Sequence, residues 1–188
     1  MKNLIVIIVV ILFGCSVFAD VPPTEEELQE ATRWYVEERM GRVFYYTHGA
    51  AVWGHEFGFY KNINDYENDI LWLTYSSIDE KVKELQGSEV IVQLDIDGTK
   101  VKVNLDYISA GTIGFTHIMH LTNWVVGDDL IKLLSNGKEL TVHIIEPKEL
   151  KELIDINGDI FSLEGFAESR KKAEEMCKNS FSEAKRIG

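Results

Sequence analysis

The chain of 188 residues has little cysteine, few basic residues and only one long apolar run. Lysine and arginine number 19 against 31 aspartates and glutamates, which gives a formal net charge of −12. A nucleic-acid-binding surface needs clustered cations to neutralise phosphates, so we do not expect nucleic acid as a partner. The remaining composition, 45% hydrophobic and 27% charged, is that of an ordinary globular domain long enough to bury a core.

The one long apolar run predicts an export signal. Lys2 gives a basic start, residues 4–13 are apolar, and small residues follow at Gly14, Ser16 and Ala19. Ten apolar residues are too few for a permanent transmembrane helix, which needs about 20. We therefore predict a signal peptide over residues 1–19 and no transmembrane helix in the mature chain.

Two processing sites are open. Residues 17–19 fit cleavage after Ala19, and we favour this site. Residues 12–15 are similar to a bacterial lipobox, in which Cys15 would carry a lipid anchor, although Phe13 is bulky for that motif. The first alternative predicts a periplasmic or secreted protein, and the second an outer-membrane-attached lipoprotein. Both leave Cys177 without a partner, so the fold must be stable without an internal disulfide.

The mature chain begins with a predicted helix over residues 20–41. Thr24 and Glu27 have the spacing of a capping box, and Gly41 is a natural end. Four apolar residues recur at helical spacing between them: Leu28, Ala31, Trp34 and Tyr35.

Residues 42–188 are predicted to form one β-rich domain. Its clearest element is a hairpin around Asp97-Gly98, the preferred two-residue turn. This turn puts four pairs on one face, which is apolar apart from Thr99: Ile96–Thr99, Leu94–Val101, Val92–Val103 and Val90–Leu105. The other face pairs Asp95 with Lys100 and Gln93 with Lys102.

Further strands are expected at residues 71–75, 112–121 and 140–144. A short helix begins at Asp128, residues 155–159 form a turn, and a closing helix starts near Leu163 with Cys177 on its apolar stripe. The predicted fold class is mainly β, a β-sandwich-like antiparallel sheet with an N-terminal and a C-terminal helix.

Catalytic signals are few. His117 and His120 have the spacing of a metal pair on a helix, but on the expected strand they point to opposite faces and cannot share an ion. His48 and His55 lie among glycines and aromatics, and Glu56 is adjacent, but only the fold could bring them together. Nucleophile elbows, phosphate-binding glycine loops and CxxC pairs are absent from the sequence.

The order of features over about residues 53–177 resembles small exported bacterial proteins of the type VI secretion-associated and invasion-associated locus B kind. The similarity rests on the strand 71–77, the hairpin 90–105, Asn123-Trp124, the strand 140–144, and the run 161–166 that opens a helix ending near Cys177. In that family the final cysteine pairs with one in the central hairpin, where this chain has Gln93 and Leu94. The resemblance implies a β-sandwich-like exported domain and no catalytic residues.

The sequence therefore predicts an exported, non-enzymatic accessory or interaction protein of the bacterial envelope. We expect no cofactor, no metal and no catalytic residue, and a protein partner in the envelope. Trp53 and Trp124 are the candidate interaction surface. Two alternatives stay open: a small hydrolase or metal-dependent enzyme using His48, His55, His117 or His120, and a lipid-anchored surface-exclusion lipoprotein.

Overall fold

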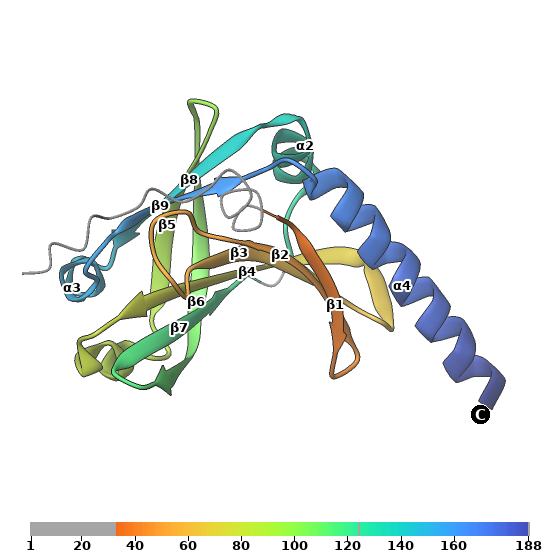
Figure 1. Ribbon diagram of the computed structural model, residues 1–188, viewed down its shortest axis with the longest axis horizontal. Coiled ribbons are helices and arrows are strands. Elements are labelled where there is room, and N and C mark those ends of the chain that lie inside the picture. Colours follow the sequence, from red (N-terminus) through yellow and green to blue (C-terminus); the bar gives the residue numbers. More distant parts are fainter. Residues whose placement is uncertain (1–32, 124, 188) are drawn as a thin grey trace, which may run out of the picture.

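The computed structural model describes residues 33–123 and 125–187. Nine strands form one antiparallel sheet in the order β1-β2-β3-β4-β7-β6-β5-β8-β9 (Figure 1). In chain order they are β1 (Tyr35–Arg39), β2 (Arg42–His48), β3 (Glu56–Asn62), β4 (Asp65–Ser77), β5 (Glu89–Ile96), β6 (Thr99–Ile113), β7 (Thr116–Thr122), β8 (Glu139–Glu146) and β9 (Gly158–Ser162). The prediction of a mainly β, antiparallel fold is confirmed.

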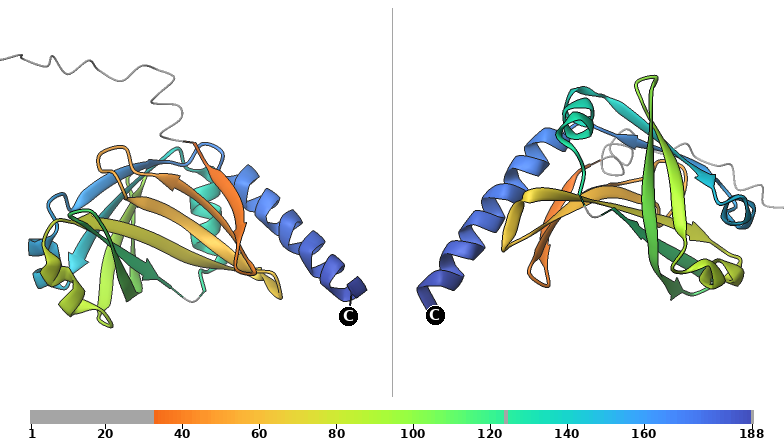
Figure 2. Two further views of the ribbon diagram at one scale, coloured as in Figure 1. Left: turned by 60° about the horizontal axis from the view of Figure 1, so that its bottom comes forward. Right: turned by 180° about the vertical axis from the view of Figure 1, so that it is seen from behind.

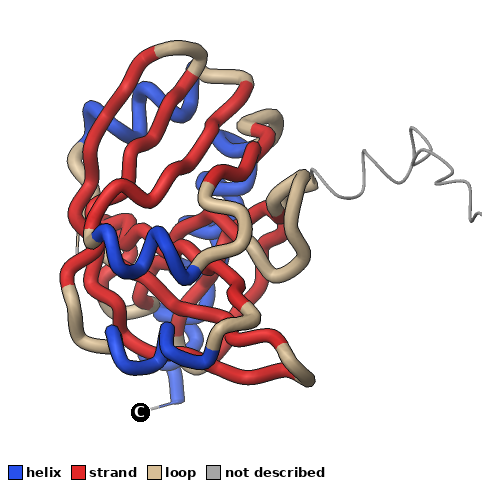
Figure 3. The backbone as a smooth tube through the Cα atoms, turned by 90° about the vertical axis from the view of Figure 1, so that its left-hand side faces the viewer, coloured by secondary structure: helices blue, strands red, loops and turns tan. Residues whose placement is uncertain are grey.

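The sheet is strongly bent, so that its two halves cross and face each other (Figures 1 and 2). Figure 3 shows the bend from the side. The Tyr75 hydroxyl of β4 donates to the Val142 carbonyl of β8 at 2.8 Å, although three strands separate them in the sheet. Buried residues from both halves form one core cluster on the inner face. The predicted division into a sandwich is not confirmed, because all nine strands belong to one sheet.

The central hairpin has the predicted register. Every pair expected from the Asp97-Gly98 turn occurs between β5 and β6. Asp97 and Gly98 have φ values of 48° and 89°, as a tight hairpin turn requires. The Asp97 carboxylate also accepts hydrogen bonds from the amides of Lys138 (2.9 Å) and Glu139 (3.1 Å), which attaches this turn to the start of β8.

Within the described residues four helices flank the sheet: η1 (Glu80–Leu85), α2 (Asp128–Asn136), α3 (Lys148–Leu153) and α4 (Phe166–Ile187). The closing helix α4 packs along β1 and β2, and its far end runs past the sheet (Figure 2). Of the helices in the part of the chain that the structure describes, none combines the length and the apolarity needed to cross a bilayer.

The prediction that the N-terminal helix extends to residue 41 is wrong. Residues 20–32 lie outside the described residues, but Tyr35–Arg39 form the edge strand β1. This strand pairs with β2 through a turn at Met40-Gly41, where both residues have positive φ. Pairing with the sheet outweighs the helical spacing of Trp34 and Tyr35, because local propensity is weaker than tertiary context.

A buried charge cluster attaches α4 to the sheet. The Asp69 carboxylate is 3% exposed and lies 2.6 Å from Lys61 Nζ. It also accepts a 2.6 Å hydrogen bond from the Tyr45 hydroxyl. From α4, Arg170 donates to the other carboxylate oxygen through Nε and Nη2, each at 2.8 Å. The Asp69 carboxylate thus binds two residues of the sheet, Lys61 and Tyr45, and one residue of the helix, Arg170.

Candidate binding groove

A row of polar side chains crosses four neighbouring strands on the outer face of the sheet, which is the face turned away from the core. His48 of β2 lies opposite Glu56 of β3. Thr74 of β4 lies opposite Glu56 on one side and His120 of β7 on the other. Directly opposite residues of antiparallel strands have neighbouring side chains on one face. This row forms the floor of a groove of about 540 Å³, hereafter the outer groove.

One side of the outer groove is aromatic. The Trp72 indole is nearly parallel to the His120 ring, with an interplanar angle of 9° and centroids 6.2 Å apart. The Tyr46 ring also packs edge-on against the Trp72 indole, with ring centroids 5.8 Å apart. Gly58 lies between these two residues in the register, and a Cβ there would overlap Tyr46. The glycine therefore allows the two rings to meet above β3.

The other side is apolar and open to solvent. The loop of residues 49–55, which joins β2 to β3, contributes Val52 and Trp53, while Ile113 and Ile118 come from β6 and β7. Trp53 is 68% exposed and Ile113 is 58% exposed. At the turn that joins β6 to β7, Phe115 is 91% exposed. The outer groove thus has a partly exposed polar floor, in which Thr74 is buried, and an exposed apolar rim.

Burial drives the ionisable groups of the floor toward their neutral forms. It lowers the pKa of His48 and of His120 below the usual imidazole value. It also raises the pKa of Glu56, against the opposing effect of Arg39. His48 Nδ1 lies 3.5 Å from Glu56 Oε1. At pH 7 the neutral form of the two imidazoles therefore predominates, and in that form each presents one donor and one acceptor.

The pKa shifts predict that folding stability falls on mild acidification. Between pH 7 and 6 the unfolded imidazoles take up protons near pH 6.5, while folded His48 and His120, whose pKa values are lowered by burial, take up fewer. The unfolded state then binds more protons, so the free energy of unfolding decreases as the pH falls. His120→Gln should flatten this slope in urea denaturation at pH 7.0, 6.5 and 6.0. An NMR titration midpoint for His120 at or above 6.5 would contradict the explanation.

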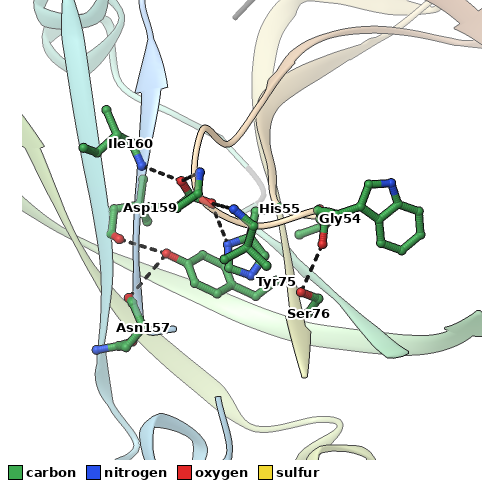
Figure 4. A network of polar contacts seen from close by, with 12 residues as sticks. Gly54, His55, Tyr75, Ser76, Asn157, Asp159 and Ile160 are labelled. Carbon is green, nitrogen blue, oxygen red and sulfur yellow. Dashed lines mark hydrogen bonds and ion pairs between the residues drawn. The ribbon is translucent and has the colours of Figure 1, made fainter. Parts of the chain in front are cut away.

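His55 does not join the outer groove but turns to the inner face, where it pairs with Asp159 of β9 (Figure 4). His55 Nδ1 donates to Asp159 Oδ2 at 2.9 Å, and both side chains are fully buried. The imidazole also lies against the Tyr75 ring, with centroids 4.2 Å apart. Burial raises the pKa of Asp159, but the hydrogen bonds from His55, Ala51 and Ile160 outweigh it and hold that pKa below its usual value.

The structure places the four histidines singled out from the sequence at three different sites. His48 and His120 line the outer groove, His55 binds Asp159, and His117 is buried on the inner face, where its Nδ1 lies 3.1 Å from the Thr112 hydroxyl oxygen. His117 and His120 point to opposite faces of β7, as expected for a strand. Among the described residues, no three histidine, cysteine or acidic side chains are grouped so as to hold a metal.

Of the two tryptophans proposed as an interaction surface, Trp53 lies exposed on the rim of the outer groove. Trp124 lies outside the described residues.

Sequence reasoning missed Asp159, which the structure places in β9 and not in the predicted turn over residues 155–159. The run Asn157-Gly158-Asp159 has turn composition, so no local signal identifies a buried carboxylate there. Lys61 and Asp69 were also missed, but alternation could have found them. Phe57, Phe59 and Lys61 share one face of β3, and Asp69 shares the face of Leu71 and Leu73 on β4.

Comparison of the chain with protein-family models, with curated proteins and with solved structures returns no match. The resemblance to the type VI secretion-associated and invasion-associated locus B proteins stays a prediction from the sequence.

Proposed function

We propose that the protein is an exported, non-enzymatic accessory protein of the bacterial envelope, and that it binds a protein partner through the outer groove. The observation that carries this proposal is the exposed apolar rim, where Trp53 and Ile113 border a polar floor. Protein interfaces are enriched in aromatic residues and arginine, and they bury apolar anchors beside satisfied polar groups. The outer groove, with Trp53, Trp72 and Arg39 among its lining residues, has this composition.

Export is supported by residues 1–19 of the sequence. The two processing alternatives are separated by mass spectrometry of the mature N-terminus. An unmodified terminus at Asp20 supports a free periplasmic or secreted protein, whereas a lipidated terminus at Cys15 supports the anchored surface-exclusion lipoprotein.

Site-specific photocrosslinking in the native envelope tests the binding proposal. A benzophenone side chain at Ile113, on the rim, should give one adduct with an envelope protein, while the same probe at Ile156 should give none. Ile156 is the matched control because it is 46% exposed and does not line the outer groove.

Trp53→Ala should weaken the binding of the partner identified in this way by about 30-fold, because truncating a hot-spot tryptophan costs about 2 kcal/mol. Affinity is measured with the purified pair, with Ile156→Ala as the control variant. An unchanged affinity, or adducts of equal yield from both probe positions, would refute the proposed surface.

A second candidate function is hydrolysis, which the His48–Glu56 contact of 3.5 Å favours as an acid–base pair. Of the described residues that line the outer groove, the one hydroxyl is on Thr74, and it donates to the Gly54 carbonyl at 2.7 Å. A hydrolase would therefore need a bound water as its nucleophile. Turnover of model esters or phosphoesters that His48→Gln abolishes would favour this function over binding alone.

A further inference from the structure

The loop of residues 49–55, hereafter the Trp53 loop, joins the two opposed halves of the bent sheet. On one side it contacts β9, where the Ala50 amide donates to the Ile160 carbonyl at 2.9 Å. On the other side it contacts β4, where the Ser76 hydroxyl donates to the Trp53 carbonyl at 3.2 Å (Figure 4). The Thr74 hydroxyl, also on β4, donates to the Gly54 carbonyl. The part of the rim that carries Val52 and Trp53 is thus formed by a segment that has no strand ladder of its own.

Asp159 is the centre of the contacts that fix this loop. Its Oδ1 accepts from the amides of Ala51 (2.9 Å) and Ile160 (2.7 Å). Its Oδ2 accepts from the Val52 amide (3.2 Å) and from the His55 ring (2.9 Å). An ionised carboxylate has about four acceptor sites, so all of them are used. Three of the four donors belong to the Trp53 loop, and two of these directly precede Trp53.

The loop is also shaped to receive this carboxylate. A Cβ at Gly49 would overlap the Asp159 side chain, so the backbone can approach it only because residue 49 is glycine. The Gly49 amide donates to the His55 carbonyl at 2.9 Å, which closes the loop on itself around Asp159. Asp159 is 1% exposed, and solvent therefore does not compete for these hydrogen bonds.

We propose that Asp159 is a positioning residue for the outer groove: from the inner face, it holds the Trp53 loop in the conformation that presents the indole at the rim. That the positioned loop serves to bind a partner rests on the proposed function; that Asp159 holds the loop does not. Asp159 touches no residue of the groove floor through its side chain. It acts through the amides of Ala51 and Val52 and through the ring of His55.

Asp159→Asn tests the proposal with nearly unchanged volume. One carboxylate oxygen becomes an NH₂ group that cannot accept, so at least one loop amide loses its partner. In protein containing 5-fluorotryptophan, the Trp53 ¹⁹F resonance, assigned with Trp53→Phe, should split or broaden, while the Trp34 and Trp72 resonances stay in place. The ¹⁵N spectrum should also show His55 changing from the Nδ1–H tautomer to the Nε2–H tautomer.

Asp69→Asn is the matched control, because Asp69 is an equally buried carboxylate of the inner face with no contact to the Trp53 loop. It should lower stability and leave the Trp53 resonance unchanged. If Asp159→Asn does not fold, His55→Leu, whose side chain has no donor, removes one of the four contacts and is measured in the same way. An unchanged Trp53 resonance in a folded variant, or an equal change in Asp69→Asn, would overturn the proposal.

Photocrosslinking from Ile113 adds a readout for binding. The adduct yield should fall about tenfold in Asp159→Asn, since a loosened loop must be ordered when the partner binds. A yield that stays at the wild-type level although the Trp53 resonance has changed would overturn the positioning role. If the wild-type protein gives no adduct while the resonance still changes, the proposed function fails and the geometric control of the loop by Asp159 stands.

Discussion

Replacing Asp69 by alanine should lower the free energy of unfolding by about 3–5 kcal/mol, because it removes one partner from a buried ion pair. Lys61 is 1% exposed and lies 2.6 Å from this carboxylate, so its ammonium would lose this counter-charge, while its hydrogen bond to the Tyr66 carbonyl, 3.0 Å away, would stay. Tyr45 would lose the acceptor of its hydroxyl, and Arg170 would lose its anchor on the sheet. Urea denaturation followed by circular dichroism measures the loss.

Asp95→Ala is the control for this prediction. Asp95 also has a lysine partner, Lys100, but their charged atoms are 4.0 Å apart and the lysine side chain is 63% exposed. Exposed ion pairs contribute about 0–1 kcal/mol, so this variant should unfold almost like the wild type. Similar losses in the two variants would show that burial does not govern the contribution of Asp69.

A double variant separates the ion pair from simple packing. In Asp69→Ala with Lys61→Met, the uncompensated ammonium is replaced by an apolar chain of similar length. Part of the stability lost in Asp69→Ala should then return, because the main cost in that variant is a buried charge without a partner. A double variant less stable than Asp69→Ala alone would mean that Lys61 stabilises the fold through contacts other than the carboxylate.

Local features of the sequence were sufficient to predict the central hairpin. Asp97-Gly98 fixes the turn, and the alternation in residues 90–105 independently fixes the same register, so two signals agreed. The edge strand β1 had no such support. Its five residues pair with β2 in the fold, while the sequence around Trp34 has helical spacing. A short edge strand is specified mainly by the strand beside it, and the wrong prediction followed from that.

The site was only partly predictable for a related reason. His48, Glu56 and His120 were all noticed in the sequence, but they become neighbours only when β2, β3, β4 and β7 lie side by side. Asp159 is 104 residues away from His55 along the chain. Hydrophobic alternation shows which face of a strand a residue occupies, but not which distant strand lies opposite.

Phe166→Ala should lower the free energy of unfolding by about 3–5 kcal/mol through the cavity that it leaves. Phe166 is fully buried at the start of α4. Its ring lies 5.2 Å from that of Trp34, 5.6 Å from that of Phe59 and 6.0 Å from that of Tyr45. Phe115→Ala is the control, since that ring is 91% exposed and its removal should change stability by less than about 0.5 kcal/mol. A small loss in Phe166→Ala would mean that α4 adds little to the core.

Combining Phe166→Ala with Asp69→Ala tests whether α4 is held at two coupled points. Both residues contact Tyr45, Phe166 through the ring and Asp69 through the hydroxyl. If the loss of one contact lets α4 move from the sheet, the second substitution removes less, and the double variant should be more stable than the sum of the two losses predicts. We expect an interaction energy of about 0.5–3 kcal/mol, as for residues that share a partner. Additive losses would instead show that the aromatic cluster and the charge cluster hold the helix independently.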